Sequence, residues 1–246
     1  MISLSSKAKQ WISPMFYRKV LHLPQDQRVV SFTFDDVPRS AFDLASAALE
    51  DMEARGTFYV ALSMMEGLSE KAGAFAYDDL EHCLSKGHEL GCHTFSHLHF
   101  HRTHDIALIR QDMESNQRSL EQNGINVKLR DFSYPYGEQS MLARKAVSER
   151  YRTARGIEEG INRGSIDLYN LKSVKLYQSE NPLEKIFRIM ENLKRHGGWL
   201  VFYTHDIQDS YSIFGCSEDY FKSVLQKCRE LNLTIKTVGR TVTDIQ

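Results

Sequence analysis

The chain contains the stretch Val29-Val30-Ser31-Phe32-Thr33-Phe34, followed at once by Asp35-Asp36, and the rest of the sequence is organised around it. Its β-branched and aromatic side chains predict a buried strand that ends before the turn at Pro38. Two adjacent carboxylates at the end of such a strand are unfavourable, because burial disfavours the ionised form of each. A bound cation removes this conflict, since a divalent ion and hard oxygen donors satisfy one another.

Length and composition restrict the class of protein. The 246 residues suit one large domain, and an apolar content of 41% is enough for a substantial core. A net charge of -1 gives no sign of the basic face that nucleic-acid binding needs, so we expect no nucleic-acid partner. The four cysteines have no close paired spacing, and we expect reduced, buried thiols. No segment resembles a signal peptide or a membrane span, so a cytoplasmic enzyme is the expectation.

Strand-like and helix-like segments alternate from residue 29 onward. Apolar, β-branched or aromatic runs predict strands at residues 29–34, 57–61, 89–93, 132–134, 151–155, 171–176, 199–204 and 233–238. Amphipathic segments with helical spacing separate most of these strands, which indicates a parallel sheet. Residues 156–170 are polar and contain glycine, and we expect a long loop there.

Eight such units close most easily into a barrel, so the predicted fold is a distorted (β/α) barrel of seven or eight parallel strands. We expect one catalytic domain over residues 29–246. Residues 1–28 are predicted to form an N-terminal segment packed on that domain. Basic residues beside aromatic ones in this segment would also allow contact with a membrane surface.

In a barrel of this kind, the chemistry lies at the carboxyl ends of the strands. Polar residues follow these ends at several places: Asp35 and Asp36, His93 and His97, Pro135 and Tyr136, Arg155, and His205. These segments are far apart in the sequence, and this fold would gather them at one rim. Three more histidines come shortly after His97 in the sequence: His99, His101 and His104. We interpret them as part of a solvated loop and the start of a helix.

The pattern resembles the polysaccharide deacetylase family, which is carbohydrate esterase family 4 with its NodB-homology domain. The first two motifs are Thr33-Phe34-Asp35-Asp36 and His93-Thr94-Phe95-Ser96-His97. The core of the third is Pro135-Tyr136-Gly137, and Tyr203-Thr204-His205 takes the place of the last. The resemblance covers residues 29–238, nearly the whole chain.

The resemblance implies a role for each of these residues. Asp36, His93 and His97 would hold a divalent metal ion, most simply Zn²⁺, with positions left open for water and substrate. Asp35 would be the general base, and strand alternation would point its side chain away from that of Asp36. His205 would be the general acid that protonates the leaving amine.

The same resemblance implies an oxyanion site and a reaction. The backbone N–H of Tyr136, after Pro135, would help to bind the oxyanion of the tetrahedral intermediate. The reaction would be removal of an N-acetyl group from an amino sugar in a polysaccharide, an oligosaccharide or a lipid-linked precursor. The only partner expected is this N-acetylated carbohydrate, and the sequence does not specify the oligomeric state.

The sequence also departs from the family pattern. Val37 stands where many members have Gly, and Tyr203 replaces the usual Leu of the last motif. The fourth motif, with its Asp and Trp, is not recognisable, and Asp167 in that region is interpreted as a loop carboxylate. Ser133 stands where the third motif usually has an Arg that orients the base.

A base Asp beside a metal needs a partner that keeps it oriented and ionised. We predict that Arg155, at the end of the neighbouring strand 151–155, takes over this role from position 133 through a bidentate contact with Asp35.

Two other function classes stay open at the level of the sequence. One is another carbon–nitrogen hydrolase on the same scaffold, such as a sugar deformylase or a ureide-type hydrolase. The other is a non-catalytic carbohydrate-binding protein. In each case Tyr169, Tyr211 and Phe214, in long loops near the rim, are candidates for stacking on a sugar face.

Overall fold

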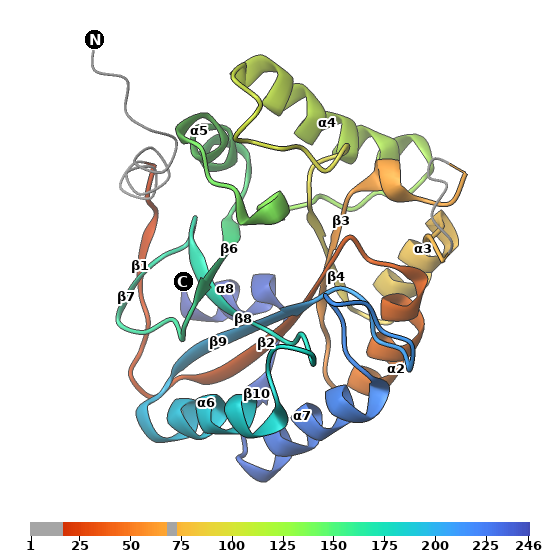
Figure 1. Cartoon of the computed structure of the whole chain (residues 1–246). Helices are drawn as coiled ribbons and strands as arrows, with labels where there is room; N and C mark the ends of the chain where they lie inside the picture. Colours follow the sequence, from red (N-terminus) through yellow and green to blue (C-terminus); the bar gives the residue numbers. More distant parts are fainter. Residues whose placement is uncertain (1–16, 68–72) are drawn as a thin grey trace.

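The computed structural model of the protein describes residues 17–67 and 73–246. Parallel strands pair side by side and close into a ring, because the last of them also pairs with the first (Figure 1). In pairing order they are β2 (Arg28–Asp35), β3 (Thr57–Val60), β4 (Glu89–Cys92), β5 (Asp131–Ser133), β6 (Thr153–Glu159), β8 (Leu171–Lys175) and β9 (Gly198–Thr204). The predicted (β/α) barrel is therefore confirmed, with seven strands in the closed ring.

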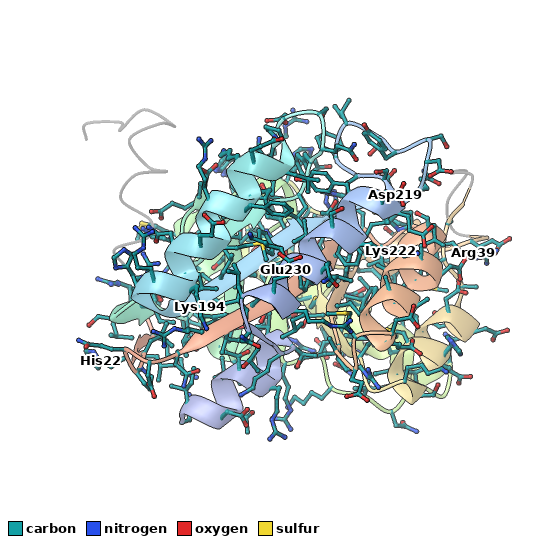
Figure 2. The ribbon with its side chains drawn as sticks, turned by 90° about the horizontal axis from the view of Figure 1, so that it is seen from below. His22, Arg39, Lys194, Asp219, Lys222 and Glu230 are labelled. Atoms are coloured by element: carbon teal, nitrogen blue, oxygen red, sulfur yellow. The ribbon has the colours of Figure 1, made fainter. Side chains whose placement is uncertain are left out.

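Helices surround this ring (Figure 1). They are a π-helical turn (Ala41–Ala45) leading into α2 (Ser46–Glu50), then α3 (Tyr77–Ser85), α4 (Ile106–Gln122), α5 (Met141–Arg150), α6 (Leu183–His196) and α7 (Glu218–Glu230). Short 3-10 turns lie at Leu62–Met64 and Pro135–Gly137. Figure 2 shows the outer surface of α7, where Lys222 and Glu230 point to solvent, while Val224 and Leu225 of the same helix are buried.

The two faces of β2 differ in chemistry. Phe32 and Phe34 face the outer helices and pack against Phe221 of α7, with ring centroids 5.4 Å and 5.9 Å apart. The alternate residues Ser31 and Asp35 face the barrel interior, since successive side chains of a strand point to opposite faces. The strand therefore stabilises the helical layer with one face and brings a carboxylate into the barrel with the other.

Helix α8 (Val238–Ile245) covers one end of the barrel and lies behind the ring of strands in Figure 1. Its Val238 and Val242 pack in a second apolar cluster together with Val29, Trp199 and Val201 of the barrel strands. The predicted strand 233–238 is wrong for most of its length. Only β10 (Thr234–Ile235) is extended, and it pairs with β2 outside the ring. The Thr237 side chain accepts a hydrogen bond from the Arg240 N–H, which starts a helix where β-branched residues suggest a strand.

The loop predicted at residues 156–170 is also wrong. Strand β6 continues to Glu159, and a further strand, β7 (Ser165–Asp167), pairs antiparallel with β1 (Val20–His22). The partner of β7 comes from more than 140 residues earlier in the chain, so no local pattern could reveal this pairing. β1 belongs to the predicted N-terminal segment 1–28, of which residues 1–16 lie outside the described part, so the division into segment and domain stays a prediction.

All four cysteines are free and buried, as expected. Among the described residues, no helix has both the length and the hydropathy needed to cross a bilayer.

A cluster of charged side chains lies at the beginnings of β3, β4 and β5. Glu89 accepts hydrogen bonds from the Gly239 N–H (2.8 Å) and the Thr57 hydroxyl (3.0 Å), and Arg152 lies 3.3 Å from its other oxygen. The same Arg152 contacts the buried Asp131 at 2.5 Å. Because two carboxylates share one guanidinium, burial and the charge of Asp131 raise the pKa of Glu89 to about 7.

This cluster predicts a pH-dependent contribution to stability. The folded state binds the Glu89 proton more tightly than the unfolded state does, so the free energy of unfolding falls as pH rises from about 4.5 to about 7. Glu89→Gln keeps a neutral side chain of the same shape and removes this titration. The difference between the two urea midpoints, variant minus parent protein, should therefore increase as the pH rises from about 5 to about 8.5. Parallel midpoints across this range would contradict the assignment.

Candidate active site

The carboxyl ends of four strands bring the candidate residues to one rim. Asp35 is the last residue of β2, His93 directly follows β4, and His205 directly follows β9. The turn that contains Pro135 begins two residues after β5. In (β/α) barrels this is the face that carries the chemistry.

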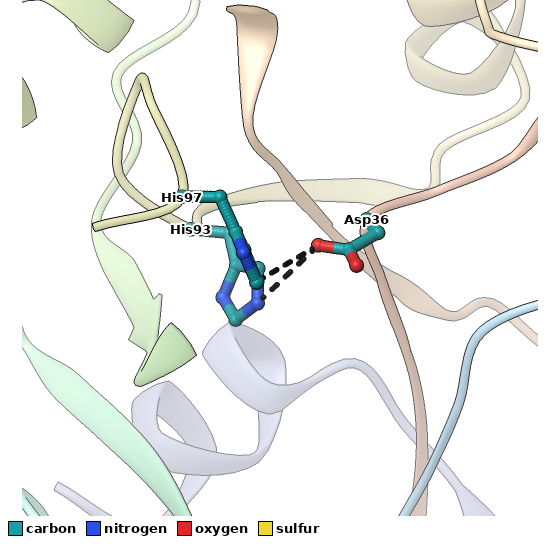
Figure 3. Close-up of side chains that lie close together, drawn as sticks. All are labelled: Asp36, His93 and His97. Atoms are coloured by element: carbon teal, nitrogen blue, oxygen red, sulfur yellow. Dashed lines mark ion pairs between the residues drawn. The ribbon is translucent and has the colours of Figure 1, made fainter. Parts of the chain in front are cut away.

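Asp36, His93 and His97 form a group whose three candidate ligand atoms all lie within 4.8 Å of one another (Figure 3). The Oδ1 atom of Asp36 lies 3.1 Å from Nε2 of His97 and 3.7 Å from Nε2 of His93. That oxygen is buried and accepts no hydrogen bond from any residue that the structure describes. Two imidazoles and a carboxylate suit a divalent transition metal, so the residues present fit a metal ion.

Burial favours the neutral form of both imidazoles. It lowers the pKa of His93, and burial together with the charge of His93 lowers the pKa of His97 to about 4. The Ser133 carbonyl lies 2.8 Å from Nδ1 of His93, so this nitrogen carries the proton and donates it to the carbonyl. The Nε2 lone pair of His93 therefore faces Asp36, in the form that binds a metal.

The backbone around this group is unusual. Several non-glycine residues here lie in the left-handed region: Asp36 (φ 56°), Val37 (φ 41°), Thr94 (φ 61°), His97 (φ 53°) and Tyr136 (φ 57°). Such conformations cost of order 1–3 kcal/mol each and concentrate at functional sites. We expected strand alternation to point the side chains of Asp35 and Asp36 in different directions, but alternation is not the cause. Asp36 lies beyond β2, and the left-handed turn redirects its side chain.

Asp35 lies inside the barrel, in contact with the completely buried guanidinium of Arg155. The Nη2 atom of Arg155 donates hydrogen bonds to Oδ2 of Asp35 and to Oγ of Ser133. Burial alone would raise the pKa of Asp35, but the charge and the hydrogen bond of Arg155 lower it below its ordinary value. Ser133 and Arg155 are direct partners in the pairing of β5 with β6, so the arginine sits one strand away from the position expected in the family.

Two details of the predicted Arg155 contact are wrong. The contact uses one nitrogen and is not bidentate, because Nη1 donates to the Gly156 carbonyl at 3.0 Å. Arg155 also lies near the beginning of β6 and not at its end, since this strand runs to Glu159. The guanidinium therefore reaches Asp35 within the barrel, and it packs over the ring of Tyr203 at 4.5 Å.

His205 lies near the other carboxylate oxygen of Asp36, with its Nε2 4.0 Å from Oδ2. Two aromatic rings flank it: Phe214 with a centroid distance of 5.4 Å and Tyr177 with one of 5.8 Å. The Tyr177 hydroxyl lies 3.5 Å from Nδ1 of His205. The imidazole is thus fixed by packing, with Nε2 directed toward the site.

Tyr136 lies beside His97, and about half of it is exposed. Its ring stacks on His99 with centroids 3.8 Å apart and meets the edge of His97 at 4.3 Å. His99 and His101 both pair with Glu138, at 3.2 Å and 3.5 Å. These two histidines support the turn that carries Tyr136 and lie outside the Asp36–His93–His97 group.

Tyr177 and Glu138 were not predicted from the sequence as residues of the site. Tyr177 comes two residues after β8, and this place beyond the carboxyl end of a barrel strand is the signal that could have singled it out. Tyr169, expected as a sugar-stacking residue, is buried instead, and its carbonyl accepts a hydrogen bond from Arg144. Asp167 forms a 2.7 Å ion pair with the same Arg144, which gives it a structural role.

Comparison with known proteins supplies independent information. A family model described as polysaccharide deacetylase matches residues 22–152. No curated protein matches the chain significantly.

Solved structures share the fold at low sequence identity. The peptidoglycan deacetylase PdaC from Bacillus subtilis is 18% identical with a TM-score of 0.60, and the match covers 89% of this chain and 91% of that one. A family 4 carbohydrate esterase from Streptomyces lividans, in complex with acetate, is 15% identical with a TM-score of 0.57 and coverage of 85% and 91%. A CE4 family pseudoenzyme from Bacillus anthracis is 13% identical with a TM-score of 0.62 and coverage of 88% and 66%.

The buried ion pair predicts non-additive stability. Arg155→Met should lower the free energy of unfolding by about 3–5 kcal/mol, because it leaves the Asp35 charge buried without a partner. Adding Asp35→Asn should recover part of this loss, since it removes the unpaired charge. Urea denaturation of the metal-free proteins measures both values.

The control for this cycle is Arg118→Met, which breaks an exposed pair with Glu114 on α4 and should change stability by less than about 0.5 kcal/mol. Purely additive effects of the Asp35 and Arg155 substitutions would contradict the assigned pair.

Proposed function

The chain belongs to the polysaccharide deacetylase family, and we propose that it is a metal-dependent hydrolase that removes an N-acetyl group from an amino sugar. The observation that carries this proposal is the buried Asp35, held by Arg155, beside the group formed by Asp36, His93 and His97. Binding of a sugar needs neither a set of metal ligands nor an ionised carboxylate next to it. The substrate class is an N-acetylated polysaccharide, oligosaccharide or lipid-linked precursor.

Asp36, His93 and His97 are the residues that would hold the metal ion, for which we propose Zn²⁺. Such an ion would lower the pKa of a water molecule and polarise the amide carbonyl of the substrate. The lowered pKa values of both imidazoles support this assignment, as does Oδ1 of Asp36, which is buried, faces both rings and accepts no hydrogen bond from any described residue.

Asp35 is the proposed general base, which takes the proton of the attacking water. Its lowered pKa keeps it ionised, and Arg155 holds the carboxylate through Oδ2. The second oxygen, Oδ1, is buried and has no hydrogen-bond partner among the described residues, so it is available to accept the proton. Arg155 is in this account a positioning residue that acts through Asp35.

His205 is the proposed general acid. Its Nε2 faces the site, and an imidazole is suited to donate a proton to the leaving amine near neutral pH. The N–H of Tyr136 is the proposed donor to the oxyanion, with Pro135 fixing the turn before it.

Two other functions are weaker candidates. Another carbon–nitrogen hydrolase, such as a sugar deformylase or a ureide-type hydrolase, would use the same residues and release formate or ammonia in place of acetate. A non-catalytic role has one observation in its favour, since the fold includes a pseudoenzyme from Bacillus anthracis. The presence of Asp35 beside a complete ligand group favours catalysis in this chain.

We also propose a cytoplasmic location. Four free and buried cysteines support it, because unpaired thiols are typical of a reducing compartment.

The metal assignment predicts the effect of removing a ligand. His93→Ala and His97→Ala should each lose stoichiometric metal and hydrolysis while keeping the fold, as measured by plasma mass spectrometry, acetate release and circular dichroism. His104→Ala, an exposed histidine that is not part of the ligand group, should keep both metal and activity. Full metal occupancy in the two ligand variants would exclude the assignment.

The acid and base roles predict a different pattern. Asp35→Asn should keep the metal but lose activity by roughly 10²–10⁴-fold, because the water loses its proton acceptor. His205→Ala should also keep the metal, with the greatest loss for substrates whose leaving amine is most basic. Acetate release from N-acetyl sugars measures both, and near-normal turnover of Asp35→Asn would rule out its role as base.

A further inference from the structure

A pocket of about 280 Å³ opens at the rim, on the side of Asp36 and His205. It is bounded by the turn after β2 and by the loop between β9 and α7, which is drawn in blue on the same side of the barrel as α2 in Figure 1. Most of its wall is apolar, and the apolar side chains are those of Val37, Pro38, Met64, Ala74, Phe75 and Phe214.

Three polar side chains of this wall, those of Asp206, Gln208 and Ser212, are engaged with one another. Asp206 accepts hydrogen bonds from the Ser212 hydroxyl (2.6 Å) and the Ser212 N–H (2.7 Å), and from the Gln208 amide (3.1 Å). The Phe214 carbonyl accepts from the His205 N–H at 3.1 Å. A hydroxyl-rich group that meets the apolar part of this wall would therefore lose hydrogen bonds with water and find few replacements.

The place of the pocket relative to His205 fixes which part of a substrate enters it. His205 is the proposed donor to the leaving nitrogen, so the amine side of the scissile amide must lie next to this imidazole. The imidazole is itself one wall of the pocket. The sugar ring, which carries the amide nitrogen, therefore lies beside the imidazole. A substituent that extends from the ring on this side meets Phe214, whose ring centroid lies 5.4 Å from that of His205.

We propose that this pocket binds an apolar substituent, such as an alkyl or aryl aglycone, carried by the amino sugar on the amine side of the amide. The inference rests on the proposed function and narrows its substrate class to sugars linked to an apolar group. A polar saccharide chain on its own would leave the pocket without a matching occupant.

Val37 supports this assignment. Its side chain is fully buried, yet its backbone has a φ of 41°, which a β-branched residue adopts only at a cost. Glycine would relieve that strain, but it would also remove part of the apolar wall. Position 37 therefore carries an apolar side chain although its backbone conformation favours glycine.

The test measures binding and hydrolysis across a series of aglycones. Methyl, butyl and phenyl glycosides of glucosamine, titrated by calorimetry, need no turnover, and their N-acetyl forms report kcat/KM. Burial of three additional methylene groups should favour the butyl over the methyl glycoside by roughly tenfold or more, with the phenyl glycoside also favoured. Equal affinity for the three glycosides would overturn the proposal.

Variants locate the effect in the pocket. Phe214 and Met64 both line the pocket, so Phe214→Ser and Met64→Ser should each reduce the ratio of butyl to methyl affinity toward one. Ile213→Ser is the matched control, because Ile213 precedes Phe214 and is 68% exposed but does not line the pocket. An equal loss of the ratio in Ile213→Ser would contradict the pocket as the source.

The proposed activity and the proposed role of the pocket can be contradicted by different results. If the glycosides bind with the expected preference but no N-acetyl form is hydrolysed, the proposed activity is wrong and the pocket stands. If all N-acetyl forms are hydrolysed at equal rates and their products bind equally, the activity stands and the pocket assignment is wrong.

Discussion

The ion pair between Asp35 and Arg155 is the constraint on which the site depends. A carboxylate in the interior of a barrel stays ionised only if a charge compensates for its lost hydration, and the buried guanidinium provides that charge. Space for it is provided by Ser133, the direct pairing partner of Arg155, which is small and accepts a hydrogen bond from the same nitrogen. Arg155 and Ser133, on two neighbouring strands, therefore act together to hold the carboxylate of Asp35. This arrangement leaves one oxygen of Asp35 unpaired beside the ligand group.

The ligand group depends on a second constraint, the left-handed turns after β2 and β4. Asp36 follows Asp35 directly, and a continued strand would carry its side chain away from the rim. The turn at Asp36 and the one at His97 bring both side chains back to His93. These turns cost free energy that the barrel must offset elsewhere, and the ring of strands with its two apolar clusters is what holds them.

Much of this organisation could be predicted from the sequence, because it depends on local patterns. Apolar runs mark all seven strands of the ring, and polar residues at their ends mark the rim. The pairing of β1 with β7 could not be predicted, since it joins segments more than 140 residues apart. The position of Arg155 was predicted from an incorrect strand end, and its contact exists because β5 and β6 pair in register. Backbone turns at non-glycine residues leave no mark in composition, so the cause of the Asp35–Asp36 separation was beyond the sequence.

The most direct test of the account is anomalous diffraction from crystals grown with zinc. We expect one peak within about 2.0–2.2 Å of Nε2 of His93, Nε2 of His97 and a carboxylate oxygen of Asp36. We also expect that Asp35 stays with Arg155 and does not coordinate the ion. A peak coordinated by Asp35, or one found only at Glu138 with His99 and His101, would contradict the central claim that the rim separates a ligand carboxylate from a base carboxylate.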